Sequence, residues 1–129
     1  MRNNNGMEKE KMNLTIEGLL AGLKQKHPNI RAHEEDDEDW WQQGMNMLIS
    51  DDLEEAEKTF EQLILAEPEH HDGYEGLALV YLHRGNKERA LFLIEHALTL
   101  ARSFFEKGTL DQEILDDMEG EKKEILDME

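Results

Sequence analysis

The 129-residue chain contains no cysteine, which excludes disulfide bonds, thiolate metal sites and thiol nucleophiles. Aromatic residues make up only 6% of it, so we expect a mainly aliphatic core in which methionine fills irregular gaps. Lys and Arg number 14 against 31 Asp and Glu, which gives a formal net charge of −17. Nucleic acid and anionic membranes are therefore not expected as partners, because a basic patch is missing. The acidic balance favours solubility and could steer the chain toward a basic partner.

Long apolar runs are also missing. The apolar run near the amino terminus, LLAGL at 19–23, is too short for a signal peptide, and nothing reaches the length of a transmembrane helix. The polar residues before it predict a disordered tail over 1–12. We therefore expect a cytoplasmic protein of one domain.

Proline occurs only twice, and Val, Ile and Thr are sparse beside Leu, Glu, Ala and Lys, so the composition favours an all-α fold. Both prolines separate segments whose apolar residues have helical spacing, where helices are expected to end. The spacing predicts helices over 13–26, 37–49, 53–66, 71–84, 87–106 and 110–127. Connections as short as those after residue 49 require neighbouring helices to be antiparallel.

Turn residues mark the ends of several predicted helices. Gly85 is expected to end one helix and Asn86 to cap the next. Gly108 should stop the helix before it. Thr109 with Gln112 has the spacing of a capping box for the last helix.

The sequence repeats itself with a period of thirty-four residues. The matched pairs are Trp40 and Tyr74, Gly44 and Ala78, Met47 and Tyr81, Ala56 and Ala90, Phe60 and Ile94, and Leu63 and Ala97. The small residues in these pairs would let antiparallel helices approach closely, and the aromatic residues would fill the spaces between successive helix pairs.

This pattern resembles the tetratricopeptide repeat, in which an aromatic residue, Leu-Gly, Tyr, Ala, Phe and Pro recur at set spacings. The positions that carry the resemblance are Trp40, Gly44, Met47, Ala56, Phe60 and Pro68 in the first unit, and Tyr74, Leu77, Ala78, Tyr81, Ala90 and Ile94 in the second. Ala97 is a further small residue expected to pack between the helices of the repeat. The resemblance implies a short α-solenoid of antiparallel helix pairs, with two repeats over 37–106. Residues 13–36 would then form an amino-terminal helix and linker, and residues 107–129 a carboxy-terminal capping helix.

In tetratricopeptide proteins the first helix of each pair lines a concave groove that binds peptides or helices. The resemblance implies that the groove residues are Trp41, Met45, Leu48, Asp72, Glu75, Leu79, Leu82 and His83. The repeat itself does not require Trp41, and its apolar neighbours would suit an amphipathic helix or a hydrophobic peptide. Alternatively, the helix at 13–26 could fold back over this stripe and make Trp41 part of the core.

Residues with metal-binding or catalytic chemistry form no recognised motif. The acidic run at 34–39 lacks the ligand spacing and central glycine of an EF-hand, and its charges suit the positive end of a helix dipole. No two of the six histidines stand four apart on a helix, and His71 with Glu75 offers only two ligands. Ser50 and Ser103 lack the setting of a nucleophile. We therefore expect no metal centre, no cofactor and no catalysis.

The main expectation is a non-catalytic interaction module that binds a peptide or amphipathic helix of another protein, with a basic partner suiting its acidic surface. The alternative is a chaperone. The chain also resembles the acidic type III secretion chaperones, which are small tetratricopeptide proteins that hold apolar segments of exported proteins. Their amino-terminal helix can mediate dimers, so that resemblance implies a homodimer.

Overall fold

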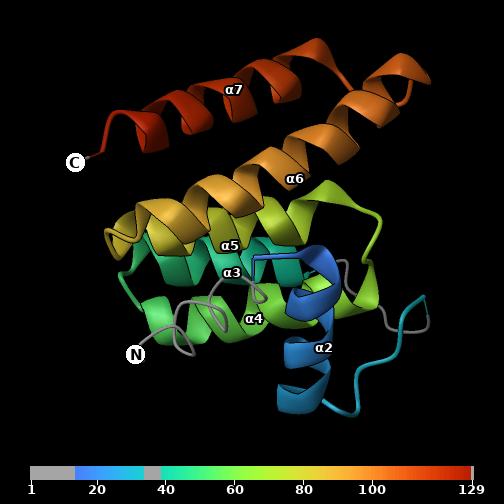
Figure 1. The fold of residues 1–129 in the computed structure, drawn as a ribbon, viewed down its shortest axis with the longest axis vertical. Helices are drawn as coiled ribbons and strands as arrows, with labels where there is room; N and C mark the ends of the chain where they lie inside the picture. The colour runs from blue at the N-terminus through green and yellow to red at the C-terminus, as the bar shows by residue number, and fades with distance from the viewer. Residues whose placement is uncertain (1–13, 34–38, 129) are drawn as a thin grey trace, which may run out of the picture.

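The computed structural model describes residues 14–33 and 39–128, and within these ranges all regular structure is helical (Figure 1). The helices are α2 (Ile16–Lys26), α3 (Trp40–Ile49), α4 (Leu53–Ala66), α5 (His71–His83), α6 (Lys87–Glu106) and α7 (Gln112–Leu126). The expected all-α class is confirmed, and each predicted helix is present with shifts of a few residues at its ends. The predicted tail over 1–12 lies outside the described residues.

The helix ends follow the turn chemistry in most places. The Asn86 side chain accepts a hydrogen bond from the backbone N–H of Arg89 at 3.2 Å, while Gly85 and Gly108 adopt φ values of 76° and 78°, which glycine tolerates best. The prediction for Thr109 was wrong. Its hydroxyl donates to the carbonyl of Phe104 at 2.9 Å, so it closes α6 instead of opening α7.

Phe60 on α4 determines how closely α3 and α5 approach it. The ring is fully buried. A Cβ placed on Gly44 of α3 would lie 2.5 Å from Cζ of Phe60. A Cβ placed on Gly76 of α5 would collide with the side of the same ring. Only residues without side chains leave room for this ring. The Trp41 ring also packs on it, with 5.8 Å between the ring centroids.

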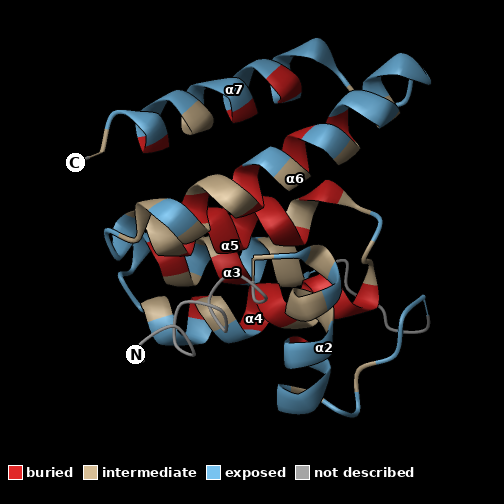
Figure 2. Ribbon diagram, viewed as in Figure 1, coloured by how far each residue is buried: buried red, intermediate tan, exposed pale blue. Residues whose placement is uncertain are grey.

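The remaining core lies mainly between α4, α5 and α6 (Figure 2). The predicted repeat-packing residues that are fully buried are Ala56, Tyr74, Ala78, Ala90, Ile94 and Ala97, with Leu77 at 1% exposure. Trp40, Met47, Pro68 and Tyr81 are partly buried. The hydroxyl of Tyr74 donates to the carbonyl of Pro68 at 2.7 Å, which ties the start of α5 to the preceding turn.

Each helix from α3 to α7 packs on the next, and α5 also lies beside α3 and α7. Helix α2 packs on α4 and crosses in front of it in Figure 1. The alternative in which the helix at 13–26 covers the Trp41 stripe was therefore wrong, because α2 makes its helix contacts with α4 and not with α3. None of the described helices has the length and apolar character needed to cross a membrane.

Candidate functional site

The predicted groove residues of α3 form a partly exposed apolar stripe. Trp41 and Met45 are half-buried, whereas Leu48 is buried. Ile49, which follows Leu48, is 79% exposed, the highest value among the large hydrophobic side chains of the described residues. Because the ring of Trp41 packs on Phe60, Trp41 stabilises the fold as well as lining this stripe.

The predicted groove residues of α5 are more enclosed than those of α3. Glu75 and Leu79 are buried, Asp72 and Leu82 are half-buried, and only His83 is exposed. Helix α5 packs on α4 and α6 and also lies beside α3 and α7, so little of its surface is left open. The structure therefore leaves the α3 part of the predicted groove more open than the α5 part.

Two histidines stack at the start of α5. His70 caps the helix with extended backbone angles (φ −99°, ψ 146°), and its Nδ1 accepts a hydrogen bond from the N–H of Asp72 at 3.2 Å. The rings of His70 and His71 are 4.5 Å apart and 24° from parallel. Phe104 packs on both rings.

The His71 side chain points its Nδ1 toward carboxylates. This nitrogen lies 3.3 Å from Oδ1 of Asp72 and 3.9 Å from Oε1 of Glu75, yet it makes no hydrogen bond. The side chain is only 5% exposed. Burial lowers the pKa of His71, and the nearby charge of Asp72 opposes that shift.

Two carboxyl groups meet between α5 and α7. Burial raises the pKa of Glu75 to about 7 and that of Glu121 to about 9, and a hydrogen bond between the two carboxyls lowers the first and raises the second. Oε1 of Glu121 is buried without a hydrogen-bond partner. No Lys or Arg among the described residues forms an ion pair with either carboxyl, so no such charge offsets the burial that raises both pKa values.

The sequence contained a signal for Glu121 that the groove prediction did not use. Met118 and Ile125 are fully buried residues of the apolar stripe on α7. Glu121 follows Met118 by three positions and precedes Ile125 by four, so it lies on the same helix face. An acid in the middle of an apolar stripe indicates a buried carboxyl.

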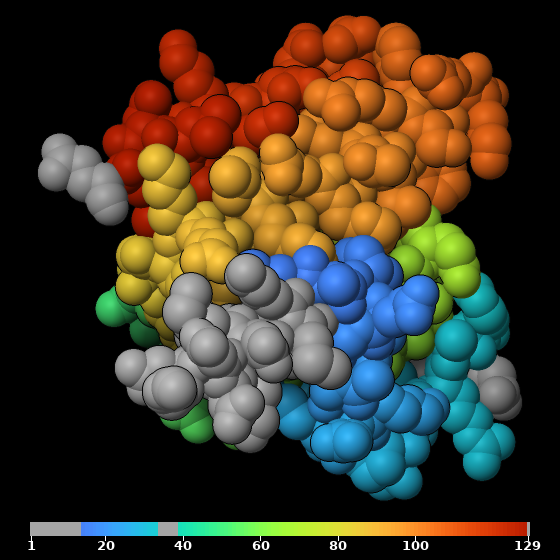
Figure 3. All heavy atoms as spheres, in the orientation of Figure 1, coloured from blue at the N-terminus to red at the C-terminus, as the bar shows by residue number. Residues whose placement is uncertain are grey.

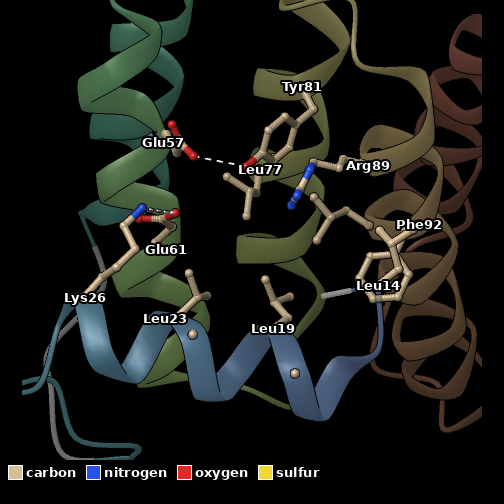
Figure 4. Close-up of a pocket in the computed structure, with 13 residues that line it drawn as sticks. Leu14, Leu19, Leu23, Lys26, Glu57, Glu61, Leu77, Tyr81, Arg89 and Phe92 are labelled. Atoms are coloured by element: carbon tan, nitrogen blue, oxygen red, sulfur yellow. Dashed lines mark hydrogen bonds and ion pairs between the residues drawn. The ribbon is translucent and has the colours of Figure 1, made fainter. Parts of the chain in front are cut away.

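A separate pocket of about 200 Å³ lies between α2 and the helices α4 to α6. Its walls include Leu23 of α2, Leu77 of α5 and Phe92 of α6 (Figure 4). A Cβ added to Gly22 would meet no atom within 4 Å, so the absence of a side chain at this position helps to leave the space empty.

Ion pairs fix α2 at one edge of this pocket. Glu61 of α4 is 3% exposed, and its two oxygens contact Nζ of Lys26 at 2.9 Å and Nε2 of His27 at 3.0 Å. In the space-filling view, the surface of α2 is seen next to that of α6 (Figure 3). The sequence did not reveal this pocket, because its lining depends on which side of the helix pairs α2 occupies.

Comparison of the chain with known protein families, with curated proteins and with solved structures found no match. Its function is therefore inferred from the sequence repeat and from the geometry of these surfaces.

Proposed function

We propose that the chain is a non-catalytic module of the tetratricopeptide type, a short α-solenoid that binds a segment of another protein on the face formed by α3 and α5. The packing of Phe60 against Gly44 and Gly76 supports this proposal most directly. It gives a physical reason for the small residue at Gly44 of the first repeat, while Gly76, which lies outside the repeated positions, lets α5 approach the same ring.

The open part of this face suits an apolar segment with a basic flank. Ile49 is largely exposed, and Met45 and Trp41 are partly exposed beside it. An amphipathic helix or a hydrophobic peptide would bury these side chains. The net charge of −17 would steer a basic partner toward the chain.

Ile49 offers a sharper test than Trp41, because its side chain is exposed and contributes little to the core. We expect Ile49→Asp to abolish capture of partner proteins from a lysate of the source organism, as measured by mass spectrometry. Once a partner peptide is known, calorimetry should show its affinity at least about tenfold weaker. Ile114→Asp on α7 is the matched control, because Ile114 is also exposed, at 40%.

Circular dichroism should show the same helix content in both variants. Equal capture by the wild type and Ile49→Asp would contradict the proposal. The chaperone alternative predicts dimers formed through the amino-terminal helix. In the structure, Lys26 and His27 bind Glu61 within the same chain, and light scattering of the full chain tests whether such dimers form.

A further inference from the structure

Nitrogen and oxygen donors gather where α5 begins. His70, His71 and Asp72 each offer one ligand atom, and these three atoms lie within 4.8 Å of one another. Nδ1 of His71 is 3.3 Å from Oδ1 of Asp72, and Nδ1 of His70 is 3.6 Å from Oδ2 of the same side chain. In a tetrahedral zinc site with bonds of about 2.0–2.1 Å, neighbouring donors are about 3.3 Å apart. The two spacings are close to that value.

A second, independent observation is that the buried side chain of His71 has a polar atom without a hydrogen-bond partner. Its side chain is 5% exposed, it points Nδ1 into this group of donors, and that atom has no hydrogen-bond partner. A buried polar atom without a partner is costly, and such atoms are rare in folded proteins. A ligand that accepts the lone pair of this nitrogen would remove the cost.

We propose that His70, His71 and Asp72 form a binding site for a divalent transition-metal ion of the zinc type, with Glu75 as the fourth donor. Oε1 of Glu75 lies 3.9 Å from Nδ1 of His71, so a small side-chain rotation brings it to the distance of a neighbouring ligand. This site does not depend on the proposed binding of a partner protein.

The donor set selects the class of ion. Two imidazoles with two carboxylates suit Zn²⁺, Co²⁺ or Ni²⁺, whereas Ca²⁺ and Mg²⁺ prefer oxygen donors alone. The two carboxylates would balance the charge of a divalent ion. At His70 the ion would compete with the hydrogen bond that the backbone N–H of Asp72 donates to Nδ1. At His71 it would bind Nδ1, which has no hydrogen-bond partner. Glu121, whose carboxyl is hydrogen-bonded to that of Glu75, would orient the Glu75 carboxylate as an outer-shell partner.

Helical spacing alone does not reveal this site, because it places only His71 and Glu75 one turn apart on the same face. Consecutive residues inside a helix point about 100° apart, which argues against grouping His70 with His71. However, His70 precedes the helix and has extended backbone angles. Its ring therefore stacks on His71 instead of pointing away from it.

The test uses the full chain without a histidine tag, stripped with EDTA and desalted, in buffer with excess Mg²⁺ to suppress binding by surface acids. Titration with Zn²⁺ in a calorimeter should show one equivalent bound. Titration with Co²⁺ should give the visible absorption bands of a tetrahedral ion. His71→Ala and Asp72→Asn should each weaken Zn²⁺ binding by at least about tenfold.

His83→Ala is the matched control, because His83 is an exposed histidine on the same helix, and this variant should bind Zn²⁺ like the wild type. Circular dichroism checks the fold of each variant, and Asp72→Asn decides the question if His71→Ala does not fold. Absence of stoichiometric binding by the wild type would overturn the proposal. Undiminished affinity in Asp72→Asn would also overturn it.

Discussion

At the scale of single residues, one aromatic ring governs the approach of three helices. Phe60 meets Gly44 at the tip of its ring and Gly76 along its side. The ring therefore has no free direction in which to give way to a new side chain. Two glycines inside helices cost about 1 kcal/mol each in helix propensity, and this close packing is the physical reason for keeping them.

We predict that Gly44→Ala lowers the free energy of unfolding by about 1–2 kcal/mol. The added methyl group would overpack the ring of Phe60 by about 1–3 kcal/mol, and the better helix propensity of alanine offsets part of this loss. Urea unfolding followed by circular dichroism measures the change.

Gly120→Ala is the matched control, because a Cβ at this helical position meets no atom within 4 Å. That variant should be more stable than the wild type, by up to about 1 kcal/mol. If Gly44→Ala were stabilised to the same degree, Phe60 would not be wedged between the two helices.

At the scale of elements, the sequence predicts where each helix lies along the chain more accurately than it predicts which helices touch. The spacing of apolar residues and the turn at Gly85 and Asn86 depend on neighbours along the chain, so the helices could be predicted. The position of α2 depends on Glu61, thirty-five residues from its partner Lys26. The pairing of Glu75 with Glu121 spans two helices as well. Such contacts are set by tertiary packing and leave little trace in local periodicity.

The carboxyl pair between α5 and α7 makes stability depend on pH. Glu75 and Glu121 have raised pKa values of about 7 and about 9, against an ordinary 4.5, chiefly because both are buried. The folded chain therefore holds protons that the unfolded chain releases above pH 4.5. Their stabilisation is fully present below that pH, and it is lost as the pH rises through the folded values.

We predict that the free energy of unfolding falls by about 1–3 kcal/mol between about pH 7 and about pH 9.5. Measurement above pH 7 avoids the titration of His71 and His96, whose pKa values are lowered by burial. Urea unfolding in the presence of EDTA, at several pH values, gives the slope.

Glu121→Gln should remove most of this slope, because an amide keeps the hydrogen bond to Glu75 but does not ionise. Glu113→Gln serves as the control, since Glu113 is an exposed acid on the same helix. An unchanged slope in Glu121→Gln would show that the carboxyl pair is not the group that titrates.

At the scale of the whole molecule, electrostatic repulsion opposes folding. Acidic residues outnumber basic ones by 31 to 14, and a compact state brings these charges together. Individual ion pairs, such as Arg84 with Glu57 at 2.6 Å, act in the opposite direction. However, partly exposed pairs contribute only about 0–1 kcal/mol each, so repulsion should dominate the response to salt.

We predict that raising NaCl from about 0.02 M to about 0.3 M increases the free energy of unfolding by on the order of 1 kcal/mol. At the higher salt concentration, the distance over which exposed charges repel one another becomes much shorter than the diameter of a domain. Urea is the suitable denaturant, since it carries no charge and leaves the ionic strength unchanged. KCl should have the same effect as NaCl, because screening does not depend on the identity of the ion. A decrease in stability with salt would mean that the ion pairs on α2 and α4 outweigh the repulsion between the remaining acids.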